Sequence, residues 1–303
     1  MERITIGPFA MTTLRNKRVL ITGAAHGLGR ELAKGFGLSG CEVIVTDLDS
    51  ARVNEAVTSL RKADISAFGY LMDVTSSASV LSAHDQIHTE RGPVDILINN
   101  AGIVSGGTFE NVPLERHKAI YDVNCFGPVT VTHAFLPELI ARPESHIVNV
   151  ASAAAFLPLP FAATYASSKW ALHGFSESLR EELRLTGQEH VRITSVCPSY
   201  ISTGMFTGVK PPLLMPMLTA QDLTNEVVSA VRTNREIVRT PWPVRLLPLL
   251  QGLFPRFLQR WFGDRLGVFQ SMQTWRDQNS PTRLAKDATP ATTTDSRSVS
   301  LSR

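Results

Sequence analysis

Short apolar segments rich in β-branched residues alternate with segments of helical length along most of this 303-residue chain. Runs such as Val19–Thr22 and Arg192–Pro198 carry apolar residues at successive positions, so both faces of each strand would be buried. Such strands are typical of a parallel sheet between helical layers, and right-handed crossovers then predict a doubly wound α/β fold. The predicted strands are Val19–Thr22, Glu42–Asp47, Ala67–Asp73, Asp95–Gly102, His146–Ser152, Arg192–Pro198 and Glu236–Thr240. The predicted helices are Leu28–Leu38, Ser50–Lys62, Ser76–Glu90, a helix before Pro143, about Ala163–Leu185 and about Ala220–Arg232.

Composition sets the limits of this domain. Hydrophobic residues make up 43% of the chain and charged residues 19%, which suffices for a large core and excludes a wholly disordered protein. The net charge of +3 is too small to indicate binding to nucleic acid. After Thr240 prolines stand among Leu, Phe, Trp and Arg, and from about residue 279 large apolar residues almost vanish. We therefore expect an N-terminal segment at 1–16, one α/β domain at 17–240, a hydrophobic and basic helical extension at 241–278 and a disordered tail at 279–303.

The apolar segments and the cysteines of the sequence bear on the cellular compartment. No unbroken apolar run precedes Lys17 and Arg18, and no segment reaches about 20 consecutive apolar residues, so neither a secretory signal nor a membrane anchor is expected. Cys41, Cys125 and Cys197 lie far apart and make no disulfide framework or metal pair, which suits small buried residues in a reducing interior. A cytoplasmic protein is the prediction.

A glycine-rich turn follows the first strand. In the segment TGAAHGLG, Gly23, Gly27 and Gly29 stand between a strand and a helix, where glycines let the backbone approach a pyrophosphate. The N-terminus of the next helix would offer unpaired N–H groups to that anion. The spacing is GxxxGxG rather than GxGxxG, and a plain turn is the alternative interpretation. With this turn the fold is predicted to be Rossmann-type.

Aspartates at the ends of the second and third strands suggest how a dinucleotide would be held. Asp47 lies 24 residues after Gly23, a spacing at which a carboxylate can accept hydrogen bonds from ribose hydroxyls and repel a 2′-phosphate. NAD is therefore favoured over NADP, although Asp49 competes for this role and the basic residues His26 and Arg52 soften the preference. Asp73 would meet the adenine amino group or cap its own loop.

Tyr165 and Lys169 stand four residues apart in YASSK, on one face of a predicted helix. A neighbouring ammonium favours the phenolate, so we expect the pKa of Tyr165 to fall toward neutrality and the phenol to act as general acid or base. Alone, such a pair is more often an ordinary helix face. Ser152 favours the catalytic interpretation because it ends a strand at the sheet edge where ligands bind. Nearby, the amides of Asn99 and Asn100 are interpreted as structural.

Several motifs occur in order along the chain: TGAAHGLG, NNAG, the Asn124 segment, Ser152, YASSK and CPSYIST. Together they resemble the short-chain dehydrogenase/reductase family over about residues 17–240. The resemblance implies a catalytic tetrad in which Tyr165 is the acid/base, Lys169 lowers its pKa and holds the nicotinamide ribose, Ser152 orients the substrate and Asn124 holds a water. The residue after Pro198 is Ser199, where the family commonly has glycine. The cofactor-binding positions that the resemblance implies are Gly23, Ala25, His26, Gly27, Leu28, Gly29, Asp47, Asp73, Val74, Asn100, Ala101, Gly102, Tyr165, Lys169, Pro198, Ile201 and Thr203.

A finer resemblance, to the retinol and 17β-hydroxysteroid dehydrogenase branch, implies lipophilic alcohols and ketones as substrates. The segment after the sixth strand is rich in Met, Phe and Leu and should lie over the site, although it could simply pack on the core. Lys210 is its one cation and is expected to be solvated. The candidate pocket residues on this segment are Met205, Phe206, Leu213, Leu214, Met215 and Met217, and those on the opposite wall are Phe156, Leu157, Leu159 and Phe161.

The extension carries an apolar stripe at helical spacing, from Leu253 to Phe262, with Arg256 and Arg260 on the other face. Two interpretations are open: the stripe packs on the body or on a second subunit, or it lies on a lipid surface as a peripheral membrane contact through 244–262. The family resemblance implies a homodimer or homotetramer.

The sequence therefore predicts an NAD-preferring oxidoreductase that interconverts lipophilic alcohols and their carbonyls, with NADP possible. An NADPH-dependent carbonyl reductase and a non-catalytic dinucleotide sensor are the alternatives. No metal is expected, because the eight histidines form no evident ligand set with Cys or carboxylates, and His84 and His88 are interpreted as a solvated helix face.

Overall fold

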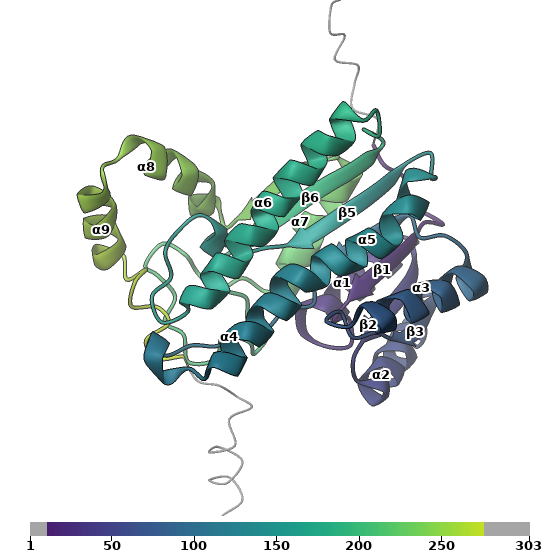
Figure 1. Ribbon diagram of the computed structural model, residues 1–303, viewed down its shortest axis with the longest axis horizontal. Coiled ribbons are helices and arrows are strands. Elements are labelled where there is room, and N and C mark those ends of the chain that lie inside the picture. The colour runs from purple at the N-terminus through teal and green to yellow at the C-terminus, as the bar shows by residue number, and fades with distance from the viewer. Residues whose placement is uncertain (1–10, 276–303) are drawn as a thin grey trace, which may run out of the picture.

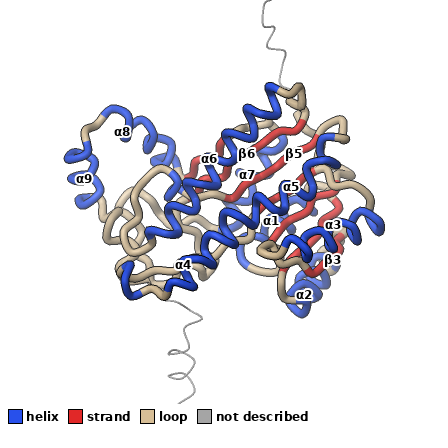
Figure 2. Tube along the Cα trace, viewed as in Figure 1, coloured by secondary structure: helices blue, strands red, loops and turns tan. Residues whose placement is uncertain are grey.

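One parallel sheet forms the centre of the molecule in the computed structural model, which describes residues 11–275. Its strands lie in the order β3-β2-β1-β4-β5-β6-β7, and all neighbouring pairs are parallel. Figure 2 shows this sheet with helices in front of it and behind it. The predicted doubly wound α/β class is thereby confirmed. The strands are β1 (Arg18–Thr22), β2 (Glu42–Asp47), β3 (Ala67–Leu71), β4 (Ile96–Asn99), β5 (Ser145–Val150), β6 (Val191–Pro198) and β7 (Ile237–Thr240).

Helices cover both faces of the sheet (Figure 1). The helices are α1 (Gly27–Leu38), α2 (Ser50–Arg61), α3 (Ser77–Arg91), α4 (Leu114–Tyr121), α5 (Gly127–Ile140), α6 (Ala163–Leu185), α7 (Ala220–Arg232), α8 (Leu247–Leu253) and α9 (Arg256–Arg265). Successive side chains of a strand point to opposite faces, so each strand contributes to two cores. On β1, Val19 and Ile21 pack with α1, α2 and α7, whereas Leu20 packs with α3 and α5.

The strand order reverses between β1 and β4. From β1 the chain proceeds outward to β2 and β3, then crosses back to β4 and continues through β7 on the other side. In open parallel sheets, ligands bind in the crevice at the carboxyl ends of the strands where this reversal occurs. The glycine turn after β1 and the polar residues Asn99 and Asn100 at the end of β4 meet at this point.

The extension after β7 forms two short helices rather than the single helical stripe expected. Helix α8 ends at Leu253, Phe254 and Pro255 are extended, and α9 begins at Arg256. A residue before proline avoids the helical conformation, which explains the break. The extension packs on the body through the fully buried Val244 and through Leu247.

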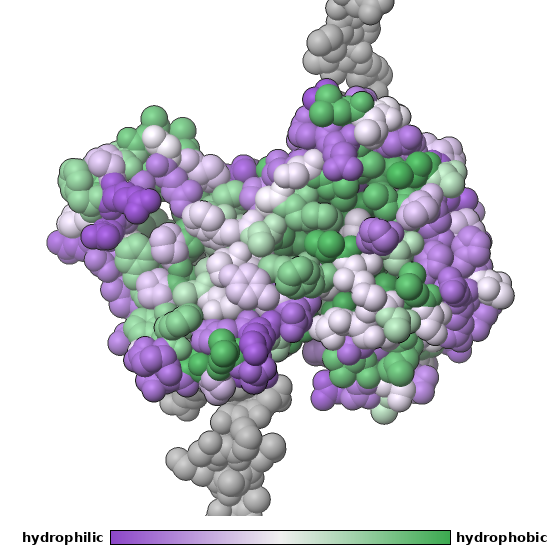
Figure 3. Space-filling model, in the orientation of Figure 1, coloured by the Kyte–Doolittle hydropathy of each residue, from purple (hydrophilic) through white to green (hydrophobic). Residues whose placement is uncertain are grey.

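The predicted stripe itself does not pack on the body of the same chain. Leu253 and Phe257 are each 69% exposed and Trp261 is 53% exposed. The prediction that the stripe packs on the body of its own chain is therefore wrong for these side chains. Contact with a second subunit and contact with a lipid surface both stay predictions. Figure 3 shows apolar surface on this arm, and also over α5 and α6.

Several predictions concern chain ends or buried thiols. The tail at 279–303, the last residues of the predicted extension and residues 1–10 lie outside the described residues. Within 11–275 no helix combines the length and the hydropathy needed to cross a bilayer. Cys41 and Cys197 are buried as expected, whereas Cys125 is half-buried, and all three thiols are free.

Candidate active site

The glycine turn is packed too tightly for larger residues. Gly23 and Gly27 adopt φ angles of +61° and +54°, which L side chains rarely adopt. A Cβ at Gly23 would lie 2.9 Å from the Ala101 Cα atom, and one at Gly29 would lie 2.2 Å from the Gly23 carbonyl oxygen. No side chain caps the N-terminus of α1, and no acidic residue stands in its first turn. The turn therefore leaves a cradle of backbone donors at a positive helix end, which fits a pyrophosphate.

Asn100 holds this turn in place. Its Nδ2 group donates to the carbonyl oxygens of Thr22, at 2.9 Å, and Gly23, at 3.1 Å. The Thr22 hydroxyl in turn accepts from the backbone N–H groups of Asn100 and Ala101, each at 3.0 Å. Asn99 donates to Thr132 and Asn149 behind the strand. Both amides make the structural contacts that their sequence position suggested.

Asp47 lies beside the glycine turn. Its carboxylate accepts from the N–H groups of Ala25, at 3.2 Å, and Leu48, at 2.8 Å, and its Oδ2 atom is 3.5 Å from Nδ1 of His26. Burial disfavours the charged form, but the hydrogen bonds from His26, Ala25 and Leu48 outweigh it and lower the pKa of Asp47. The carboxylate is therefore ionised at neutral pH and lies beside the His26 imidazole.

Asp49 and Asp73, the other aspartates considered for dinucleotide binding, are hydrogen-bonded to groups close to them in the chain. Asp49 caps α2 by accepting from the N–H groups of Ala51 and Arg52. Asp73 accepts from the N–H and hydroxyl groups of Thr75, so it caps its own loop. Val74 packs against the backbone at Gly127, where an added Cβ would lie 2.9 Å from a Val74 methyl group.

Tyr165 and Lys169 project from α6 toward the carboxyl end of β5. The Lys169 Nζ atom donates to the carbonyl oxygen of Val150 at 2.8 Å and lies 5.8 Å from the centroid of the Tyr165 ring. Ser152 follows β5 and caps a short 3₁₀ turn, Ala153–Ala155, where its Oγ atom accepts from the N–H of Ala154. A hydrogen bond joins the side chains of Ser152 and Tyr165. The structure therefore brings Ser152, Tyr165 and Lys169 together.

The expected acidification of the phenol is wrong for this structure. Burial raises the pKa of Tyr165 from 10.0 to about 12, and the hydrogen bond with Ser152 only partly opposes it. Burial also lowers the pKa of Lys169 from 10.5 to about 8. The same desolvation that disfavours the phenolate also disfavours the ammonium that should stabilise it, and one of the Nζ donors is directed at the Val150 carbonyl oxygen.

Asn124 lies in a π-helical turn, Asp122–Phe126, between α4 and α5. Such turns often occur at functional sites because they redirect side chains. The Asn124 amide donates to the Ile103 carbonyl, at 2.9 Å, and to the Ser168 hydroxyl, at 3.0 Å, and accepts from the Ile103 N–H. A Cβ added to Gly102 would lie 3.3 Å from Asn124 Oδ1 and 3.5 Å from Lys169 Nζ, so Gly102 separates the two side chains.

The segment after β6 returns over the glycine turn. A Cβ added to Gly27 would lie 3.7 Å from the Thr203 Cβ atom. Ile201 pairs with Leu218 through an isolated parallel bridge, and Pro198 ends the strand opposite Thr240. Thr203 thus lies directly against the glycine turn.

A cavity opens beside Ser152 and Tyr165. Phe206, Met215, Leu157 and Leu159 line it as predicted. Leu213 and Leu214 instead lie exposed, as do Met205 and Met217, and Phe156 and Phe161 do not line this cavity. Lys210 is exposed, as expected.

The sequence did not predict the other residues that line the cavity. Tyr200 and Pro212 line it, and so do Val268 and Ser271 from the extension. The Tyr200 and Ser271 hydroxyls lie 2.7 Å apart, and their hydrogen bond joins the extension to the segment after β6. CPSYIST contains Tyr200 and could have suggested it, but no pattern marks Val268 or Ser271.

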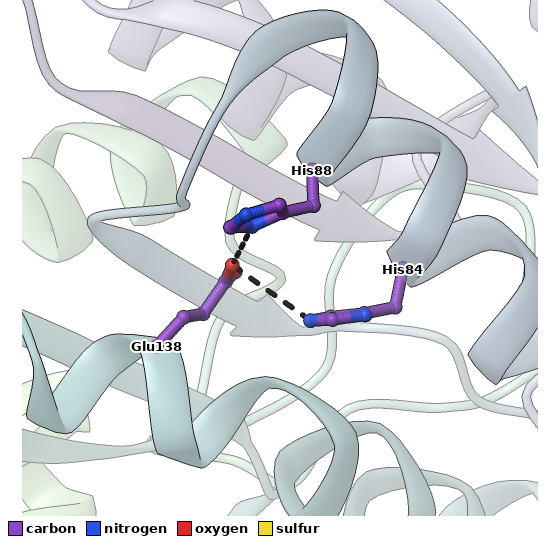
Figure 4. A group of neighbouring side chains, drawn as sticks. All are labelled: His84, His88 and Glu138. Carbon is purple, nitrogen blue, oxygen red and sulfur yellow. Dashed lines mark hydrogen bonds and ion pairs between the residues drawn. The ribbon is translucent and has the colours of Figure 1, made fainter.

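The sequence predicts that the histidines form no metal-ligand set with cysteines or carboxylates, and this prediction is wrong. His84 and His88 on α3 meet Glu138 on α5, and their ligand atoms all lie within 4.8 Å of one another (Figure 4). The two helices are distant in sequence, but they pack side by side on one face of the sheet, which no local spacing reveals.

Comparison with known proteins decides the family. A family model described as short chain dehydrogenase matches residues 17–213. The chain belongs to the short-chain dehydrogenase family. Epidermal retinol dehydrogenase 2 from Homo sapiens is 34% identical over 263 residues, covering 86% of this chain and 85% of that protein. Estradiol 17-beta-dehydrogenase 11 from Mus musculus is 33% identical over 244 residues, covering 80% and 81%.

Solved short-chain dehydrogenases share the fold. One from Burkholderia phymatum, in complex with NAD, has a TM-score of 0.72 and 26% identity, covering 80% of this chain and 96% of that one. A metagenomic short-chain oxidoreductase in complex with NADP has a TM-score of 0.65 and 26% identity, covering 76% and 97%. These neighbours support a nicotinamide dinucleotide as the cofactor of this short-chain dehydrogenase. The protein is therefore an oxidoreductase of the retinol and 17β-hydroxysteroid dehydrogenase branch, and the non-catalytic sensor is set aside.

Proposed function

We propose that this short-chain dehydrogenase interconverts lipophilic alcohols and their ketones or aldehydes, with NAD(H) as the preferred cofactor. The observation that carries the proposal is the cavity beside Tyr165, which is lined mainly by apolar side chains. Ser152 and Tyr165 line it together with apolar residues such as Leu157, Phe206 and Met215.

The polarity of the cavity favours a neutral substrate. Among the residues that the structure describes, no charged side chain lines it. Its other hydroxyls are already engaged, because Tyr200 and Ser271 bond to each other and the Ser199 hydroxyl points at the Met215 sulfur, 3.8 Å away. A carboxylate or phosphate would lose its hydration without a partner there, whereas an alkyl or ring system would gain from burial.

The reaction assigns a separate task to each side chain. A nicotinamide dinucleotide, when bound, supplies the hydride acceptor or donor. In oxidation the Tyr165 phenolate takes the proton from the substrate hydroxyl, and in reduction the phenol returns it to the carbonyl oxygen. The Ser152 hydroxyl donates to the same oxygen and stabilises its developing charge. Lys169 supplies positive charge beside the phenol, and Asn124 fixes the segment at Ile103 against α6.

The cofactor preference rests on Asp47. Its ionised carboxylate beside the cradle repels a 2′-phosphate. We expect NADH to bind more tightly than NADPH when each is titrated into the protein by fluorescence. Tighter binding of NADPH would instead support the carbonyl reductase alternative.

The substrate class is tested by a screen. The purified protein is supplied with NAD or NADP and with retinol, steroid, aliphatic and aromatic alcohols, and reduced dinucleotide is followed by absorbance. We expect turnover with bulky apolar alcohols and NAD. Turnover confined to small charged hydroxy acids would contradict the proposal.

Association and location complete the proposal. Phe126, Val129 and Trp170 expose apolar surface on or beside α5 and α6, which supports a homodimer or homotetramer formed through these helices. We also place the enzyme in the cytoplasm, with peripheral membrane contact through the α8–α9 arm. Light scattering on the purified protein measures the subunit number.

A further inference from the structure

We propose that His84, His88 and Glu138 bind a divalent transition-metal ion on the surface where α3 packs against α5, and that Zn²⁺ is the preferred ion. The site is remote from the reaction. Asn124 and Glu138 are 14 residues apart along the π turn and α5, a distance of about 21 Å at the rise of a helix. The ion would therefore join two helices and take no part in hydride transfer.

The three side chains converge on one point. Glu138 Oε2 lies 3.1 Å from Nδ1 of His88 and 3.8 Å from Nε2 of His84. The two histidines are four residues apart on α3, so they stand one turn apart on one helix face. Figure 4 shows both rings directed at the carboxylate from the neighbouring helix. A tetrahedral zinc ion keeps its ligand atoms about 3.3 Å apart. The three ligand atoms here lie within 4.8 Å of one another, so rotation of the side chains would bring them around the ion.

Neighbouring groups already orient two of the ligands. Glu138 Oε1 accepts from the Val94 N–H at 3.2 Å, which turns Oε2 toward the imidazoles. The Asp85 carboxylate lies 3.0 Å from Nδ1 of His84, which leaves Nε2 of that ring facing Glu138. The Phe135 ring packs edge-on against His84, with centroids 4.9 Å apart. Carboxylate and backbone partners of this kind fix the tautomer and direction of metal ligands in known zinc sites.

The donor set and its exposure favour zinc. Two imidazoles and one carboxylate are ligands that Zn²⁺ prefers, and hard ions such as Mg²⁺ prefer oxygen alone. Glu138 is largely shielded, whereas His88 is 53% exposed, so water can complete the coordination. The ligands come together only in the folded chain, because α3 and α5 are separate in sequence. Binding would therefore stabilise the native state.

The test uses the full-length, tag-free protein, stripped with chelator and titrated with ZnCl₂ by calorimetry near neutral pH. We expect one ion per chain and a rise of the melting temperature with zinc. His88→Ala removes an exposed ligand, and Glu138→Gln keeps an acceptor for Val94 while removing the charge. Each should weaken zinc binding by more than about tenfold. His133→Ala, an exposed histidine elsewhere on α5, is the matched control and should bind like wild type.

Cobalt gives a second readout that does not depend on stability. Co²⁺ bound in a tetrahedral site absorbs visible light, so the wild type and His133→Ala should colour on titration and the two ligand variants should not. The proposal is overturned if the wild type binds no stoichiometric zinc, or if His88→Ala and Glu138→Gln bind it as tightly as His133→Ala does. Dehydrogenase activity is expected to be equal with and without zinc.

Discussion

The carboxyl edge of the sheet and the extension after β7 both contribute residues to one cavity, but they are packed very differently. At the sheet edge Tyr165 is 5% and Lys169 4% exposed, and both are held on a long helix against a buried strand. In the extension, Val268 and Ser271 face the cavity while Leu253 and Phe257 stand in solvent. The proposed catalytic side chains thus lie on a buried helix and strand end, whereas the extension combines cavity-lining residues with exposed apolar ones.

Tyr165→Phe should give the largest effect of any change at the sheet edge. Loss of the hydroxyl removes the proton acceptor, so kcat for alcohol oxidation should fall about 10²- to 10⁴-fold. Thermal unfolding should change little, because the ring is retained. Tyr121→Phe is the control, since that exposed hydroxyl contacts only Ser167 among the groups described. Unchanged turnover in Tyr165→Phe would exclude the acid/base role.

The pH profile of the wild type tests the phenol further. With the pKa of Tyr165 raised to about 12, the phenolate fraction grows about tenfold per pH unit throughout the working range. We expect kcat/KM for oxidation to rise with pH without a plateau below about pH 10, and reduction, which uses the protonated phenol, to be limited by other steps. A plateau near pH 7 would mean that Lys169 overcomes the effect of burial.

Gly29→Ala tests the cofactor side of the crevice. The new Cβ would lie 2.2 Å from the Gly23 carbonyl and 2.6 Å from Asn100 Nδ2, so the cradle must shift. We expect a stability loss of about 1–3 kcal/mol and at least about tenfold weaker dinucleotide binding. Gly174→Ala on α6 is the control, because an added Cβ meets nothing within 4 Å there. Equal dinucleotide binding by both variants would show that Gly29 is not part of the cradle.

Val268→Ala tests whether the extension shapes the substrate site. Removing two methyl groups from the wall should raise KM for a bulky apolar alcohol by about threefold to tenfold, and leave a small alcohol unaffected. Leu249→Ala lies on the exposed side of the same arm and should leave both KM values as in wild type. If Val268→Ala changes neither substrate, the arm plays no part in recognition.

Trp261→Asp addresses the outward side of the arm. The Arg265 guanidinium lies 5.6 Å from the centroid of the exposed Trp261 ring, and Arg256 and Arg260 on the same helix are also exposed, so α9 presents both apolar and cationic side chains to its surroundings. We expect the wild type to sediment with anionic lipid vesicles and Trp261→Asp to remain in solution, with solution activity unchanged. Leu185→Asp, an exposed change at the far end of α6, is the control. Equal, negligible sedimentation of wild type and Trp261→Asp would exclude lipid and leave a second subunit as the partner.

What could be predicted without the structure depended on short-range patterns. The strand and helix sequence, the cradle of Gly23 and the pairing of Tyr165 with Lys169 all follow from residues close together in the chain. The retinol and 17β-hydroxysteroid dehydrogenase resemblance, read from such motifs, was confirmed by the comparisons. Periodicity failed in the extension, where Pro255 divides one expected helical face into two helices.

Local spacing alone thus determined the doubly wound class, the order of its elements and the residue types available for proton transfer. Tertiary packing decided how those groups behave: burial raised the pKa of Tyr165 against the expected effect of Lys169. It also placed Val268 in the wall of the cavity that Tyr165 lines, and brought Glu138 to His84 and His88. Desolvation and contacts between distant segments arise only when the chain is folded, because both depend on which surfaces exclude water and meet in space.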